Sequence, residues 1–119
     1  MHFLAPVPIL RSFSEQQAKS FYIDFLEFDL DWEHRLGQNA PLYAQISKGN
    51  CIIHLSEHYG DASPGTTLRV EIENLTQYQN LLSAKQFKHA RPGINEMPWG
   101  LEMPISDPFG NKLIFTQTS

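Results

Sequence analysis

The residues best suited to chemistry lie in one short segment, His54-Leu55-Ser56-Glu57-His58. If this segment is a strand, His54, Ser56 and His58 share one face, because strand side chains alternate. Two histidines supply only part of a metal site, since zinc and similar metals take about three or four protein ligands. No third ligand is in view, so we expect a polar cluster in which His54 exchanges hydrogen bonds with a ligand. A non-standard metal site using His54, Glu57 or His58 is the alternative.

The two tryptophans point to ligand binding. Trp32 alternates with acidic residues, and Trp99 stands in a Pro-Trp-Gly segment where Gly100 leaves room for close approach. A free aromatic ring can stack on a planar ligand, which is worth ~1 kcal/mol beyond the burial of its area. Core packing for Trp32 and a loop anchor for Trp99 are the alternatives. Carboxylates near the rings would attract a cation, and the candidates are Asp31, Glu33, Glu57 and Glu102.

Composition excludes several classes of function. The 119 residues carry 9 Lys and Arg against 13 Asp and Glu, a formal net charge of −4. This balance disfavours nucleic acid, which needs clustered basic residues. No apolar run is long enough to span a membrane. The single cysteine, Cys51, cannot form an intrachain disulfide, which predicts a reducing, cytoplasmic location, and as a buried thiol it is expected to be inert.

Hydrophobic periodicity predicts the elements that position these residues, in two halves of the same order. The first half contains a strand at 9–11, a helix opened by a capping box at 12–15, and strands at 28–33, 42–47 and 51–57. Phe28, Leu30 and Trp32 alternate with acidic residues, which predicts one apolar face on a half-buried strand. The second half contains strands at 67–73, 87–90, 101–105 and 112–117, with a helix at 75–82 after the first of them.

The order predicts an α+β protein with one domain over residues 1–119, built from tandem βαβββ units at about 5–58 and 66–118. Turn-forming residues at 58–65 separate the units, and Asp107-Pro108-Phe109-Gly110-Asn111 is a strong turn signal within the second. A generic α+β domain without duplication is the alternative.

The chain resembles bleomycin-resistance proteins, a branch of the glyoxalase/vicinal-oxygen-chelate superfamily. The resemblance rests on Met97-Pro98-Trp99-Gly100-Leu101-Glu102, on the segment 106–115 with its Asp-Pro-x-Gly-Asn turn, and on the opening segments Val7–Arg11 and Phe21–Phe28. Glu27 stands where the family usually has glycine. The resemblance implies the glyoxalase/bleomycin-resistance/dioxygenase fold.

The resemblance also implies where a metal would lie in an enzyme of the superfamily. The four positions fall at about Val7, His54, Thr67 and Ile114. Only His54 is a good ligand for a divalent metal, so we expect neither a metal nor another cofactor.

The favoured hypothesis is therefore a non-catalytic protein that sequesters a planar, cationic, bleomycin-like antibiotic in a groove between two copies. The resemblance implies a homodimer, completed by exchange of the first strand from a hinge at Pro6 and Pro8. The expected ligand-binding residues are Trp32, Tyr43, His54, Ser56, Glu57, Trp99, Gly100 and Glu102. The alternatives are a superfamily enzyme (lyase, dioxygenase or thiol transferase) and a family member with another ligand.

Overall fold

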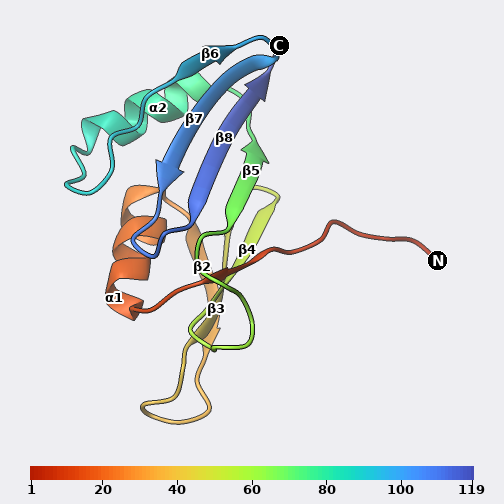
Figure 1. Ribbon diagram of the computed structural model, residues 1–119, viewed down its shortest axis with the longest axis vertical. Helices are drawn as coiled ribbons and strands as arrows, with labels where there is room; N and C mark the ends of the chain where they lie inside the picture. Colours follow the sequence, from red (N-terminus) through yellow and green to blue (C-terminus); the bar gives the residue numbers. More distant parts are fainter.

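The computed structural model describes all residues, 1–119, and contains two βαβββ units (Figure 1). The first unit comprises β1 (Ile9–Arg11), α1 (Glu15–Ala18), η1 (Lys19–Phe25), β2 (Asp29–His34), β3 (Tyr43–Lys48) and β4 (Cys51–Ser56). The second comprises β5 (Thr67–Glu71), α2 (Leu75–Ala84), β6 (Asn95–Met97), β7 (Gly100–Ser106) and β8 (Lys112–Thr118). The α+β class and the repeated order of elements are confirmed.

The two sheets have the same topology. Their strand orders are β1-β4-β3-β2 and β5-β8-β7-β6, and in each the first strand pairs in parallel with the last while the other pairs are antiparallel. In the single chain, β1 pairs with β4 of the same unit. The segment before β1 extends away from the body of the molecule (Figure 1).

The helical segment of the first unit begins two residues later than predicted. Ser14, not Ser12, is the N-cap, and its hydroxyl accepts a hydrogen bond from Gln17 N at 3.2 Å. Ser12 is instead buried, and its N–H donates to Ser56 O. After one α-helical turn, the chain continues as a π-helix, η1, which buries Phe21 and Tyr22.

Glu27, in the turn after η1, has a backbone conformation that favours glycine. Glu27 has a φ of 64°, in the left-handed region that glycine adopts without steric cost. Its carboxylate lies 2.7 Å from Lys85 Nζ, and this ion pair lowers the pKa of Glu27. The side chain therefore gains a contact with the second unit that glycine could not make.

The predicted strand at 87–90 is wrong, because β6 forms at Asn95–Met97 instead. The helix α2 ends in a turn in which Gln86 has a φ of 51°. Phe87 then stacks on Phe25 with 4.5 Å between ring centroids. Phe87 is therefore apolar because it packs against the first unit, and it is not part of a strand.

A β-bulge in β2 changes which face each of its residues occupies. Leu30 pairs with Ile46, whereas Trp32 pairs with Gln45, so the register shifts between Leu30 and Trp32. Ile46 is buried and Gln45 lies on the opposite face of β3. The prediction that Leu30 and Trp32 share one face is therefore wrong, since the extra residue at Asp31 turns Trp32 away from the core.

Both units contribute to one hydrophobic core of 17 buried residues, which includes aromatic residues of η1 together with residues of α2, β7 and β8. The turn after β7 adds a buried polar link. Asp107 accepts hydrogen bonds from the Tyr22 hydroxyl at 2.7 Å and from the Asn111 amide at 2.8 Å. Asn111 in turn donates to Arg11 O of β1.

No helix of the protein has both the length and the apolar character that a membrane crossing requires.

Candidate functional site

The candidate site begins with a row of side chains across the face of the first sheet that is turned away from the core. In register, Ile9, His54, Gln45 and Trp32 follow one another across β1, β4, β3 and β2. Their neighbours along the strands, such as Ile53, are buried on the opposite face. We call the face that carries Trp32, Gln45 and His54 the first open face.

An aromatic cluster dominates the first open face. Trp32 lies nearly parallel to Tyr43, with 6.0 Å between ring centroids and 10° between planes. The His54 ring packs edge-on against Trp32 at 5.4 Å and Tyr43 at 5.2 Å. Trp32 retains 44% of its accessible surface. The cluster therefore presents a partly exposed flat surface rather than a filled core.

A chain of hydrogen bonds fixes the orientation of His54. The Asp31 carboxylate can only accept, so Gln45 Nε2 donates to it at 3.1 Å. Gln45 Oε1 then faces His54 Nε2 at 2.9 Å, which requires a proton on that nitrogen. The other nitrogen of the neutral ring, Nδ1, accepts from the Tyr43 hydroxyl at 2.8 Å. The Asp31 bulge thus sets the tautomer of His54 through Gln45.

The electrostatics of this face come mainly from Asp31. Its second carboxylate oxygen accepts from the Ser47 hydroxyl at 3.0 Å, and no cationic side chain pairs with it. Burial raises the pKa of the Tyr43 phenol, and the Asp61 carboxylate adds to the effect. Tyr43 therefore stays a neutral hydrogen-bond donor to His54 at neutral pH.

Three residues expected at the site, Ser56 and Glu57 beside His54 and Glu33 near the tryptophan rings, are engaged with other residues. Glu57 accepts from Leu42 N at 3.0 Å and faces Arg35 at 3.9 Å. Ser56 is fully buried and donates to Asp61 at 2.7 Å. Glu33 forms an ion pair with Lys19 at 3.1 Å.

A second set of candidate residues lies on the second sheet. Trp99 Nε1 donates to Glu102 at 2.6 Å, and Arg69 donates to the same carboxylate oxygen at 2.6 Å. Hydrogen bonds from Arg69 and Trp99 lower the pKa of Glu102. Trp99 keeps 51% of its surface exposed. We call the face that carries Arg69, Trp99 and Glu102 the second open face.

Gly100 allows two strands to approach each other closely. Its φ is 139°, and a Cβ at this position would lie 2.2 Å from the backbone oxygen of Gln117 in β8. The absence of a side chain at Gly100 therefore lets β8 approach β7 closely.

Sequence reasoning missed Gln45 and Arg69. Gln45 could have been found from its alternation with Tyr43 along the strand, because the two lie on the same face. The link between Gln45 and Asp31 depends on the bulge, for which the alternation of residue types in β2 gives no signal.

The positions at which the resemblance would place a metal have few ligating neighbours. His54 pairs with Ile9 and Gln45, and Ile114 pairs with Arg69 and Pro104, so neither has a His, Cys, Asp or Glu side chain beside it in the sheet. Both ring nitrogens of His54 are engaged within the chain. Nowhere in the chain do three His, Cys, Asp or Glu side chains come together in a group that could hold a metal ion.

Comparison with known proteins places this fold in a family. A family model described as "Glyoxalase superfamily protein" matches residues 1–119. No curated protein matches the sequence significantly.

Solved structures agree over the whole chain at low identity. The bleomycin-binding protein from bleomycin-producing Streptomyces verticillus, in complex with copper(II)-bleomycin, has a TM-score of 0.75 and 24% identity, with 100% of this chain and 99% of that chain covered. An antibiotic-binding protein from Streptomyces sp. CB03234 has a TM-score of 0.74 and 22% identity, with both chains fully covered. A bleomycin-binding protein in complex with bleomycin has a TM-score of 0.76 and 16% identity, with 98% and 100% covered. The family match over all 119 residues and the duplicated βαβββ topology together establish that this chain belongs to the glyoxalase superfamily.

Proposed function

We propose that the protein binds a planar, cationic small molecule of the bleomycin type, between two copies of the chain, without catalysing a reaction. Binding would withhold the molecule from its target by mass action, because only the free fraction can act. The observation that carries the proposal is the Trp32–Tyr43 wall on the first open face beside the Asp31 carboxylate.

The aromatic wall suits a flat ligand. The planes of the Trp32 and Tyr43 rings differ by only 10°, so a planar heterocycle can stack on this surface. His54 forms hydrogen bonds with Tyr43 and Gln45, and these bonds hold the aromatic wall in place before a ligand binds. A rigid wall lowers the entropy cost of binding.

The Asp31 carboxylate favours a positively charged ligand. Of the four acidic candidates, Glu33, Glu57 and Glu102 each lie beside a basic side chain, whereas Asp31 has none. An unpaired carboxylate on the first open face attracts cations. The net charge of −4 acts in the same direction.

A second copy would complete the groove. One chain leaves both open faces uncovered, and apolar side chains near β1, including Phe3, Leu4 and Val7, are exposed. A partner that brings its second open face over the first would enclose a ligand between Trp32 and the partner's Trp99. The exposed segment before β1 would reach the partner by strand exchange.

The direct test is calorimetric titration of the purified protein with metal-free and copper-loaded bleomycin, with tryptophan fluorescence followed in parallel. We expect saturable binding at one ligand per chain. Trp32→Ala and Trp99→Ala should each weaken affinity about tenfold, as expected for the loss of a stacking partner. The matched control is Tyr59→Ala, which removes an aromatic side chain that is 90% exposed and belongs to neither sheet.

Two outcomes would contradict the proposal. One is absence of saturable binding to either form of bleomycin. The other is binding that all three variants leave unchanged. Sedimentation equilibrium tests the assembly separately, because a chain that stays monomeric at micromolar concentration would remove the shared groove.

A further inference from the structure

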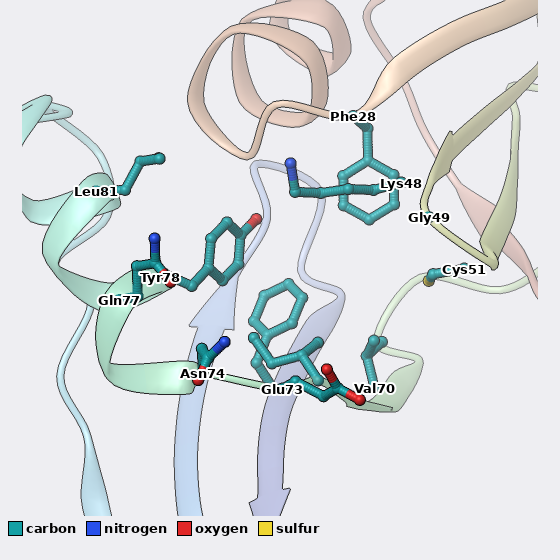
Figure 2. A pocket seen from close by; sticks show the side chains of 12 residues that line it. Phe28, Lys48, Gly49, Cys51, Val70, Glu73, Asn74, Gln77, Tyr78 and Leu81 are labelled. Atoms are coloured by element: carbon teal, nitrogen blue, oxygen red, sulfur yellow. The ribbon is translucent and has the colours of Figure 1, made fainter.

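A pocket of about 340 Å³ lies at the junction of the two units, outside both open faces (Figure 2). Its volume is within the range of about 300–1,000 Å³ typical of small-molecule sites. One wall comes from the turn between β3 and β4, and the other from β5 and α2. The apolar lining residues are Phe28, Cys51, Val70, Ile72, Tyr78, Leu81 and Phe115.

The apolar surface of this pocket is only partly covered by the chain itself. Leu81 on α2 is 40% exposed, and Val70 and Ile72 are only half-buried although they lie on the core side of the sheet. Tyr78 is held in place, because its hydroxyl donates to Leu26 O at 2.7 Å. The pocket thus has a fixed aromatic wall and an apolar lining that a ligand could cover.

One cation lines the pocket. Lys48 Nζ lies 5.8 Å from the centre of the Tyr78 ring and donates to Glu27 O at 3.2 Å. An ammonium group has three N–H donors, so two remain for a ligand. The acidic lining residue, Glu73, lies at the other end of the pocket, near Val70 (Figure 2).

We propose that this pocket binds a small aromatic anion, a molecule with one carboxylate or sulfonate group. The aromatic part would lie against Tyr78 and the apolar lining, and the anionic group would accept hydrogen bonds from Lys48. Asn74 adds a polar group at the pocket, since its side chain does not cap α2. The separation of Lys48 from Glu73 fixes which end of the pocket holds the anion.

The single cysteine gives a direct readout of occupancy. Cys51 lines the pocket and is half-buried, and burial raises the pKa of its thiol. Neutral N-ethylmaleimide can still label it slowly at pH 8, because a fraction of the thiol is ionised. A bound ligand would cover the sulfur and slow the reaction further.

The experiment compares two probes that differ by one charged group. 1-Anilinonaphthalene-8-sulfonate carries a sulfonate, and N-phenyl-1-naphthylamine is the same ring system without it. We expect both to bind with saturable fluorescence and to slow labelling of Cys51. Lys48→Met keeps an unbranched apolar stem, so it should weaken sulfonate binding about three- to fivefold, as for a partly exposed ion pair. It should leave binding of the neutral probe within about twofold.

The control is Lys88→Met, which removes the same charge from a lysine that does not line this pocket. It should leave both probes unaffected. The proposal is overturned if neither probe protects Cys51, or if Lys48→Met and Lys88→Met weaken the sulfonate equally. Neither result bears on bleomycin binding at the open faces, and failure to bind bleomycin would leave protection of Cys51 unchanged.

Discussion

The Tyr43 hydroxyl lies 2.8 Å from His54 Nδ1, and the two rings stand nearly perpendicular, at 78°. Because His54 Nε2 also forms a hydrogen bond, with Gln45 Oε1, both nitrogens of the imidazole are held in place. The phenol ring then lies flat beside Trp32. Hydrogen bonds between side chains on the first open face therefore determine the shape of the aromatic wall.

Replacing Asp31 should release this arrangement. In Asp31→Ala the Gln45 amide loses the acceptor that orients it, so its oxygen no longer has to face His54. We expect the Nε2–H tautomer of His54 to give way to a mixture of tautomers. Two-bond ¹H–¹⁵N correlation spectra of the imidazole measure this directly. Asp29→Ala, on the same strand, should leave the spectrum unchanged, and identical spectra for both variants would contradict the mechanism.

Loss of the Tyr22 hydroxyl should destabilise the contact between the units. In Tyr22→Phe one hydrogen bond to the buried Asp107 carboxylate disappears, which costs about 1–3 kcal/mol of unfolding free energy. Urea denaturation followed by circular dichroism gives the value. Tyr59→Phe is the matched control, since Tyr59 is 90% exposed and its hydroxyl makes no hydrogen bond within the chain. Equal stability of the two variants would contradict the assigned role.

Alkaline pH should destabilise the protein through two phenols, those of the buried Tyr22 and the half-buried Tyr78. Burial, reinforced by the Asp107 carboxylate, raises the pKa of Tyr22 well above its ordinary value of 10.0, and burial, together with Glu27, raises that of Tyr78. In the unfolded chain both phenols ionise near pH 10, whereas in the folded chain they stay neutral. Their contribution is thus complete below pH 10 and decreases above it, by up to about 1.4 kcal/mol per pH unit for each group.

Urea denaturation at pH 9, 10 and 11 measures this loss. Tyr22→Phe and Tyr78→Phe should each reduce the slope of unfolding free energy against pH above pH 10. An unchanged slope in the double variant would show that other groups cause the loss.

Gly100→Ala should be among the most damaging single substitutions. The added methyl group would overlap the Gln117 backbone oxygen, and the backbone conformation also disfavours a side chain. We expect a loss of about 3 kcal/mol or more, or rearrangement of β6 and β7. Gly93→Ala, whose Cβ would meet nothing within 4 Å, should change stability by about 0.5 kcal/mol at most. Thermal unfolding of both variants tests the difference, and similar melting temperatures would contradict it.

Most of the fold was predictable because its strands follow simple periodicity. Leu101, Met103 and Ile105 alternate, and Leu75, Tyr78 and Leu82 have helical spacing, so local pattern and tertiary burial agree. The prediction failed where tertiary contacts decide. Phe87 reads as a strand residue, yet it packs against Phe25 from the first unit.

The site was predictable in its residue types and less so in its geometry. Trp32, Tyr43 and His54 do come together, because each lies on the same face of neighbouring strands. Glu57 does not join them, because it follows the end of β4 and binds Leu42 N on the side of Arg35. An acidic side chain can be accommodated on either side of a strand. An acidic residue that is close to a site in sequence therefore does not have to lie in that site.

The bulge at Asp31 determines how β2 would respond to a change in its length. At this point β2 carries one residue more than β3, so Leu30 and Trp32 occupy opposite faces although two positions separate them. Deleting Asp31 would make Leu30 and Trp32 neighbours, and ordinary alternation would still place them on opposite faces. The shortened strand would therefore keep Trp32 on the first open face and lose only the carboxylate that orients Gln45.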